Sequence, residues 1–153
     1  NLDVAFRCVR AGAALVAMHR NPWWATPAGP SLDVGAYLAG LELATRVRAT
    51  VVGKPSAALF RFAMARLRDE LAVAGGRRAR AAELLMVGDD VWADIGGAAR
   101  VGLRTAFVRS GKHGDAELAA AARGRAGRGS IVPDLVAGSV REVVEALEDR
   151  QRS

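Results

Sequence analysis

A lysine and a group of carboxylates stand at the ends of two apolar runs of the chain. The run TVV stops at Gly53-Lys54-Pro55, and the run LLMV stops at Gly88-Asp89-Asp90, with a further acid at Asp94. Clustered carboxylates repel one another unless a cation neutralises them, and hard oxygen ligands at a strand end suit Mg²⁺, which usually shares its coordination with a phosphate. A lysine at a neighbouring strand end would offset charge on a phosphoryl group and on a carboxylate that attacks it.

Each of these residues also has a plainer interpretation. Asp89 and Asp90 can cap the helix that follows them, because a helix N-terminus favours negative charge. Taken alone, Lys54 is typical of a surface lysine, and Asp90 of a cap or surface acid. Taken together, the residues favour Lys54 as catalytic and Asp89 as a metal ligand. Asp90 and Asp94 are then metal-supporting groups, with Asp94 orienting the site rather than binding the ion.

Several familiar binding motifs are missing from the sequence. Gly53-Lys54 lacks both the upstream glycine of a P-loop and the Ser or Thr that should follow its lysine. No G-x-G-x-x-G follows a strand, which argues against a dinucleotide-binding oxidoreductase. The acidic run has neither the spacing nor the closing glutamate of an EF-hand. There is no G-x-S-x-G motif and no zinc-type spacing of Cys and His.

The elements that must position these residues follow from the hydrophobic periodicity. Helices are predicted at 2–11, 35–46, 54–74, 91–100 and 140–150, and strands at 14–19, 49–52, 84–87, 104–108 and 135–137. Residues 21–30, with three prolines, are predicted to be a loop, as is 110–133 apart from an Ala-rich helical piece. From residue 49 on, strands and helices alternate, which predicts one parallel sheet with helices on both faces. Ligands of such sheets bind at the carboxyl ends of the strands.

Composition limits the remaining possibilities. The 153 residues are 51% hydrophobic, enough for one domain with a sizeable core or for a small domain and part of another. The net charge of +6 suggests nucleic acid, but the basic residues are scattered, and the denser runs at 77–80 and 123–128 fall in Gly/Ala-rich loops, so we expect no nucleic-acid partner. The single Cys8 fits a reducing cytoplasm, and no apolar run reaches the ~18 residues of a membrane span, so we expect a cytoplasmic protein without a membrane partner.

The two motifs together resemble a known family. Gly53-Lys54-Pro55, followed by G-D-D-V-W-A-D at 88–94, is similar to the third and fourth motifs of haloacid dehalogenase-like phosphatases, in the form of their type IIA branch. That branch carries an α/β cap inserted between the second and third motifs. Residues 11–19 and 30–44 resemble the second half of this cap, and V-R-S-G-K at 108–112 resembles the family's loop after the next core strand.

The resemblance covers nearly the whole chain and implies an α/β fold. Residues 1–47 would be the second half of the α/β cap domain. Residues 48–153 would be the C-terminal half of a Rossmann-like hydrolase core, so that the parallel sheet is only partly present.

The resemblance also implies a Mg²⁺-dependent phosphatase mechanism. In the family, an aspartate attacks phosphorus and forms an aspartyl-phosphate that water hydrolyses, while a second aspartate two residues on serves as acid and base. Asp89 matches the Mg²⁺ ligand of the fourth motif and Asp94 the acid that supports it. Lys54 matches the lysine that holds the nucleophile and the phosphate.

Four residues of the predicted cap are expected to select the small-molecule phosphate substrate: His19, Asn21, Trp23 and Trp24. His19 with the two tryptophans resembles the subgroup around phospholysine phosphohistidine inorganic pyrophosphate phosphatase. The alternative is a cap–cap dimer contact or a local core, because indoles are large apolar groups that seek burial.

The family's first motif, D-x-D-G-T/V after a strand, occurs nowhere in the chain. This motif supplies the nucleophile and the acid/base in the family. We therefore expect a C-terminal half that begins within the cap, is inactive alone, and forms a homodimer or pairs with the missing N-terminal half. The competing hypothesis is a non-catalytic binding or interaction module that kept the fold.

Overall fold

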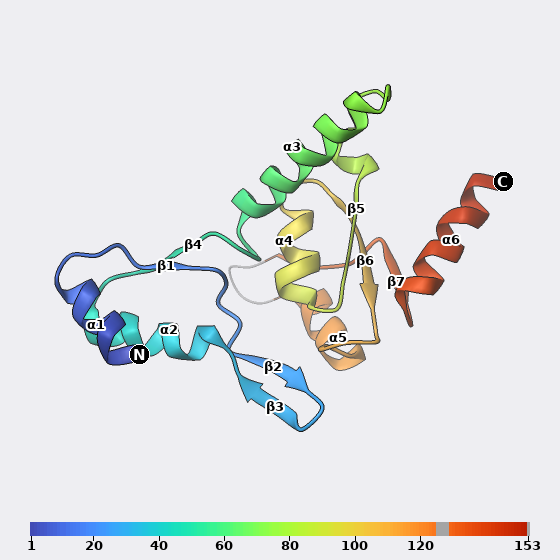
Figure 1. The fold of residues 1–153 in the computed structure, drawn as a ribbon. Coiled ribbons are helices and arrows are strands. Elements are labelled where there is room, and N and C mark those ends of the chain that lie inside the picture. Colours follow the sequence, from blue (N-terminus) through green and yellow to red (C-terminus); the bar gives the residue numbers. More distant parts are fainter. Residues whose placement is uncertain (125–128, 153) are drawn as a thin grey trace. The chain divides into compact units, whose positions relative to one another are not determined.

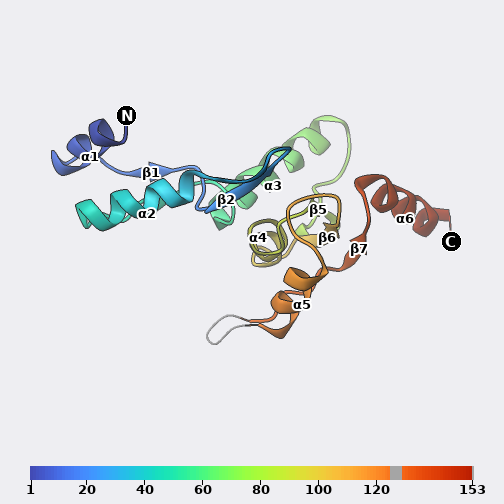
Figure 2. The ribbon, with the colours of Figure 1, turned by 90° about the horizontal axis from the view of Figure 1, so that it is seen from below.

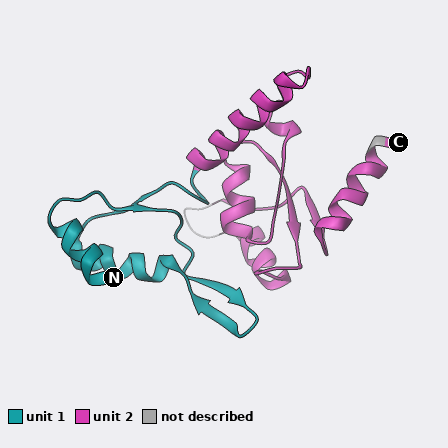
Figure 3. Ribbon diagram, in the orientation of Figure 1, with its two compact units in different colours: residues 1–56 teal, residues 57–153 magenta. Residues whose placement is uncertain are grey.

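The structure is a computed structural model that describes residues 1–124 and 129–152. The chain forms two compact units, residues 1–56 and 57–153, coloured separately in Figure 3. Most of the basic run at 123–128 lies outside the described residues. Within the described ranges, none of the helices combines the length and the hydropathy that crossing a bilayer requires. The predicted division into a cap at 1–47 and a core at 48–153 stays a prediction.

The first unit is built from two helices, a hairpin and a pair of short parallel strands (Figure 1). In chain order, its elements are α1 (Leu2–Arg10), β1 (Val16–Ala17), β2 (Trp23–Thr26), β3 (Gly29–Leu32), α2 (Val34–Thr45) and β4 (Thr50–Val51). α1 packs against α2. α2 begins at Asp33, whose carboxylate accepts a hydrogen bond from the Val34 amide at 2.7 Å, and it ends at Arg46 in a left-handed conformation.

A hairpin replaces the loop that the prolines of residues 21–30 predict. β2 and β3 pair antiparallel, with Trp23 opposite Leu32 and Thr26 opposite Gly29. The Thr26 hydroxyl closes the turn by donating to the Gly29 carbonyl at 2.7 Å, and Gly29 supplies a positive φ of 109°. The prediction was wrong because both strands of a two-stranded ribbon are edge strands, where proline is tolerated.

The second unit contains a three-stranded parallel sheet in the order β5-β6-β7. Its elements are α3 (Ala57–Val73), a 3₁₀ turn (Ala81–Glu83), β5 (Leu85–Gly88), a π-helical turn (Val91–Ile95), α4 (Gly96–Ala99), β6 (Arg104–Val108), α5 (Asp115–Arg123), β7 (Leu135–Ala137) and α6 (Val140–Arg152). The predicted α/β class is confirmed, and the Ala-rich piece of residues 110–133 is α5.

Both faces of this sheet are covered, and successive residues of β6 show how. Phe107 points to one face, where it packs with Val91 and Ile95 of the π-helical turn. Its neighbours Ala106 and Val108 belong to the other face, where the core includes Val143 of α6. Figures 1 and 2 show α4 and α6 on opposite sides of the strands, as a parallel sheet requires.

One predicted strand belongs to a different sheet. The periodicity at 49–52 predicts a strand of the same sheet as 84–87, but β4 pairs with β1. Its partners are fixed by two bonds, from the Thr50 amide to the Leu15 carbonyl at 2.9 Å and from the Val52 amide to the Ala17 carbonyl at 3.0 Å. The order of elements along the chain could not reveal this, because sequential strands are neighbours often but not always.

Candidate active site

The carboxyl end of β5 leads directly into the first candidate residues. Asp89 is half-buried and follows the last strand residue, Gly88. Asp90 is buried and begins the π-helical turn, where its Oδ1 accepts hydrogen bonds from the amides of Trp92 at 3.1 Å and Ala93 at 2.8 Å. Capping, the plainer interpretation, therefore describes Asp90, whereas Asp89 is left partly accessible. π-Helical turns of this kind occur frequently at functional sites.

Asp94 lies beneath this strand end. Its side chain is buried, and its Oδ2 accepts a hydrogen bond from the Asp90 amide at 3.2 Å. A Cβ added to Gly88 would collide with the Asp94 carboxylate. Asp94 thus packs against the backbone that presents Asp89, an arrangement suited to the supporting role that the sequence predicts for it.

The loop after β6 contacts both adjacent carboxylates. The Lys112 amide donates to Asp89 Oδ2 at 2.7 Å, and the Lys112 ammonium donates to Asp90 Oδ2 at 2.9 Å. The His113 amide reaches the Asp89 carbonyl at 3.3 Å. A Cβ on Gly111 would collide with the Asp89 carboxylate, so the loop backbone lies directly against that side chain. Neither Lys112 nor His113 is among the site residues predicted from the sequence. The signal that could have found them is their place directly after the next parallel strand.

Charge and burial at Asp90 oppose each other. Burial alone would raise the pKa of Asp90, but the hydrogen bonds from the Ala93 amide and the Lys112 ammonium outweigh it and hold that pKa below its usual range. The carboxylate and its partner ammonium are both nearly excluded from solvent, with side chains only 10% and 12% exposed. Asp90 is therefore ionised, and its charge is already matched by Lys112.

His113 is buried beside this pair and is neutral. Its Nδ1 accepts a hydrogen bond from the Val91 amide at 3.1 Å, so the ring proton is on Nε2. Burial lowers the pKa of His113 more than Asp90 raises it. The 3.6 Å approach of Nδ1 to the Asp90 carboxylate is accordingly not an ion pair. The ring meets the Trp92 indole edge-to-face, with centroids 4.7 Å apart.

Lys54 lies in the first unit, three residues after the end of β4. Gly53 before it packs against the Met18 carbonyl so closely that a Cβ would collide with that oxygen. Lys54 itself is half-buried. Because Asp89 belongs to the second unit, the predicted approach of the two residues stays a prediction.

The four predicted cap residues lie on one short stretch but do not form a single surface. The Asn21 amide donates to His19 Nδ1 at 3.4 Å, which places these two residues together before the hairpin. Trp23 and Trp24 are consecutive on β2, so their side chains point to opposite faces. Trp24 is 54% exposed, whereas Trp23 is half-buried. At most one indole can face a given ligand, and substrate selection by this stretch stays a prediction.

Asp89 fits a divalent cation as one ligand of several. It offers hard oxygens at a strand end and remains accessible, which suits Mg²⁺. Over residues 1–124 and 129–152, no three side chains of His, Cys, Asp or Glu converge on a common point. An ion held here would need further ligands from water, from a phosphate group or from another segment.

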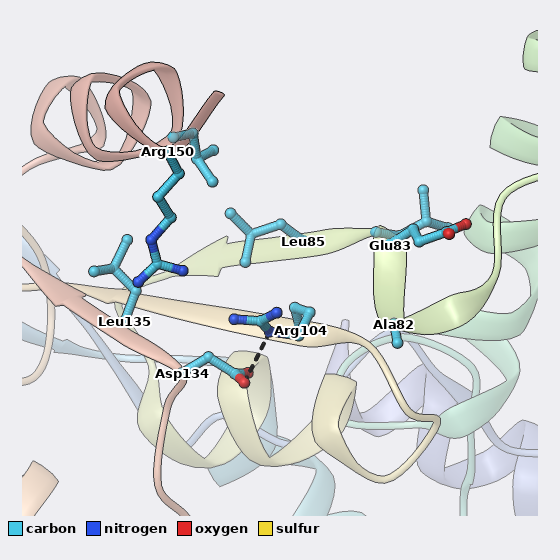
Figure 4. Close-up of a pocket in the computed structure, with 9 residues that line it drawn as sticks. Ala82, Glu83, Leu85, Arg104, Asp134, Leu135 and Arg150 are labelled. Atoms are coloured by element: carbon cyan, nitrogen blue, oxygen red, sulfur yellow. Dashed lines mark ion pairs between the residues drawn. The ribbon is translucent and has the colours of Figure 1, made fainter. Parts of the chain in front are cut away.

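A pocket in the second unit lies away from these residues. It has a volume of about 270 Å³ and is lined at the amino ends of the strands, by Leu85, Arg104 and Leu135 among others. Figure 4 shows Arg104 paired with Asp134, at a distance of 2.9 Å. Because Asp89 follows the carboxyl end of β5, this pocket is not part of the candidate site.

Comparison with known proteins settles the family. Residues 51–143 match the family described as HAD-hydrolase-like. The chain belongs to the haloacid dehalogenase-like hydrolases. The matched region contains both the Lys54 segment and the Asp89 segment, and it confirms the resemblance inferred from the two motifs.

The similar proteins include several phosphatases. The chain is 36% identical over 112 residues to haloacid dehalogenase-like hydrolase domain-containing protein 2 of Bos taurus, covering 73% of this chain and 39% of that protein. It is 40% identical over 99 residues to phospholysine phosphohistidine inorganic pyrophosphate phosphatase of Xenopus laevis, covering 65% of this chain and 33% of that protein. A glycerol phosphate phosphatase of Mycobacterium tuberculosis, solved in complex with magnesium, is 29% identical with a TM-score of 0.65, covering 92% of this chain and 37% of the other. The chain thus spans well under half the length of these relatives.

Proposed function

We propose that the chain is part of a Mg²⁺-dependent phosphatase of the aspartyl-phosphate type that acts on a small phosphorylated substrate. The observation that carries the proposal is the placement of Asp89, a half-buried carboxylate at the carboxyl end of a parallel strand, oriented by the Lys112 amide. The phosphatases among its relatives support the same activity.

In this proposal each residue has a defined task. Asp89 helps to hold Mg²⁺, which would offset charge on the phosphoryl oxygens when bound. Asp94 supports the Asp89 backbone from beneath. Lys54 attracts the phosphate and the attacking carboxylate. His19, Asn21 and one of the two indoles contact the part of the substrate that leaves.

The chain lacks the D-x-D-G motif that would supply the nucleophile and the acid/base. We therefore propose that it does not turn over phosphate esters alone and that it works beside such a motif supplied by another segment or chain, because a second copy of this sequence would lack the motif as well. The alternative is a binding module that kept the fold, favoured by the absence of three converging ligands among the described residues. A cytoplasmic location is part of the proposal, and nucleic acid is not proposed as a partner.

The first experiment titrates Mg²⁺ into the 153-residue chain and follows backbone amide shifts by NMR. Weak saturable binding centred on Asp89, and lost in Asp89→Asn, is expected. Glu70→Gln, an exposed helix carboxylate, is the matched control and should bind as the parent does. Binding that ignores Asp89→Asn would contradict the proposed metal site.

The second experiment measures p-nitrophenyl phosphate hydrolysis with and without Mg²⁺. No turnover is expected from the chain alone, since loss of a nucleophile commonly removes several orders of magnitude of rate. If the gene encodes a D-x-D-G segment before residue 1, the longer product should turn over, and Lys54→Met should slow it by roughly 100-fold or more. An inactive longer product would favour the binding module.

A further inference from the structure

We propose that Lys112 is a positioning residue that separates the roles of the two adjacent carboxylates, holding Asp90 as a cap while its own amide orients Asp89 toward a ligand. This inference deepens the proposed function and rests on it for the identity of the ligand. The contacts themselves lie wholly within the second unit.

The two neighbouring carboxylates, Asp89 and Asp90, compete for the same cation. Asp89 and Asp90 are consecutive, and both carry the same hard oxygen ligands. A cation presented with two equivalent carboxylates could settle on either. Asp90 is withdrawn from this competition because one oxygen accepts two backbone amides and the other accepts the Lys112 ammonium. Its charge is neutralised, and each of its two oxygens already accepts a hydrogen bond.

The loop after β6 fixes the orientation of the Asp89 carboxylate. One oxygen, Oδ2, accepts the Lys112 amide at 2.7 Å, which fixes the rotation of the carboxylate. Gly111 lies against the same side chain with no room for a Cβ, and the His113 amide reaches the Asp89 carbonyl at 3.3 Å. Three consecutive loop residues, 111 to 113, therefore contact Asp89.

Lys112 connects the two carboxylates. The same residue supplies the amide for Asp89 and the ammonium for Asp90, so the ammonium anchors the loop in the register that places the amide correctly. Removing the ammonium should loosen the loop and release Asp89, although the amide is still present.

This arrangement predicts that removing the Lys112 ammonium changes Mg²⁺ affinity in the direction opposite to that expected from charge alone. Lys112→Met deletes a positive charge beside a cation site, and Coulomb's law alone would then tighten Mg²⁺ binding. If Lys112 acts by positioning, binding weakens instead. Arg109→Met is the matched control, because it removes the same charge from the same loop. The Arg109 side chain pairs with the exposed Asp115 at 2.8 Å rather than with the two adjacent carboxylates.

The test uses the 153-residue chain and Mg²⁺ alone, with two readouts. In Lys112→Met, amide hydrogen exchange at residues 112 and 113 should rise about tenfold without metal, as local opening becomes easier. The Mg²⁺ dissociation constant should rise several-fold. Gly111→Ala, which keeps the ammonium but crowds Asp89, should also weaken Mg²⁺ binding. Arg109→Met should leave exchange unchanged and bind Mg²⁺ equally or more tightly.

Unchanged exchange together with tighter Mg²⁺ binding in Lys112→Met would overturn the inference. If the parent chain binds no Mg²⁺ at Asp89, the metal site of the proposed function fails, yet the exchange measurement still decides whether Lys112 positions the loop. Should Lys112→Met not fold, Lys112→Gln repeats the test with an uncharged polar side chain that is one bond shorter.

Discussion

At the scale of single residues, the buried Asp90–Lys112 pair shows how one carboxylate can be both a cap and a counter-ion. Two backbone amides and one ammonium surround Asp90 in a site nearly closed to water. Breaking such a pair by removing one partner is costly, because the remaining charge stays buried without compensation.

Asp90→Ala should therefore destabilise the second unit by about 3 kcal/mol, combining a lost cap with an uncompensated ammonium. Asp90→Asn keeps an oxygen for the cap but leaves the same buried ammonium without its counter-charge, so its loss should be smaller only by the cap contribution of about 1 kcal/mol. Urea unfolding followed by circular dichroism measures both. Equal losses for the two variants would show that the cap contributes nothing.

Some of the candidate residues could be predicted from the sequence, and others could not. The G-D-x-x-x-x-D spacing was sufficient to single out Asp89 and Asp94, because both belong to one continuous segment. The contacts of Lys112 and His113 span 22 residues or more and exist only because β5 and β6 are neighbours. A pattern that depends on strand pairing cannot be read from local spacing.

At the scale of elements, α2 is anchored by a carboxylate on its inner side. Glu42 is buried and accepts a bidentate pair from Arg20 at 2.8 and 2.5 Å, together with the Ala49 amide at 2.7 Å. One side chain thus ties α2 to the segments before and after it. The hydrogen bonds from Arg20 and Ala49 lower the pKa of Glu42 to about 2.

This shift makes the first unit sensitive to acid. A carboxyl whose folded pKa of about 2 lies below its ordinary 4.5 stabilises the fold above pH 4.5, and that contribution is lost as the pH falls toward 2. Glu42→Gln should therefore destabilise most at pH 7, and its difference from the parent should shrink below pH 4.5. Urea midpoints at pH 7, 4 and 3 test this, with Glu70→Gln as an exposed control. A pH-independent difference would contradict the assignment.

Phe107 connects β6 to the helical segments that cover one face of the sheet in the second unit. It is fully buried in β6, between the π-helical turn and α5. Phe107→Ala should cost about 3–5 kcal/mol through lost burial and the cavity left behind. Phe62→Ala, which removes a side chain 66% exposed on α3, should change stability by less than about 0.5 kcal/mol. Thermal unfolding of both variants gives the comparison.

Most elements could be predicted from their periodicity, and the failures share a cause. The helices at 2–11 and 140–150 were predicted nearly to their ends, since each has a clear period and a stop or cap. The hairpin and the partner of β4 were missed. In both cases the deciding interaction is a backbone pairing between strands of two to four residues, which leaves little hydrophobic pattern.

At the scale of the whole molecule, the net charge of +6 coexists with several local ion pairs. In the described part of the chain, Arg20 and Arg48 share Glu42, and Arg77 and Arg80 share Glu83. A basic residue paired in this way is partly neutralised by its carboxylate partner, which weakens its attraction for phosphate. The expectation that nucleic acid is not a partner stays a prediction.

The molecule as a whole should self-associate. Large apolar side chains are exposed in both units, including Met18, Leu43 and Val73, and β5 is an edge strand of its sheet. Exposed apolar surface and open sheet edges favour association. Light scattering after size exclusion should show a mass that grows with protein concentration. A strictly monomeric chain at every concentration would contradict this expectation.

The close packing around three glycines limits how such sequences can change in evolution. Gly53, Gly88 and Gly111 each lie where a methyl group would strike a carbonyl or a carboxylate. Gly53 meets only backbone, so a packed fold alone requires it, whether or not any reaction takes place. Gly88 and Gly111 meet the Asp94 and Asp89 side chains, so they are required only while those aspartates are present. A descendant that lost both aspartates would be free to lose these two glycines as well, whereas Gly53 would still be held by the fold.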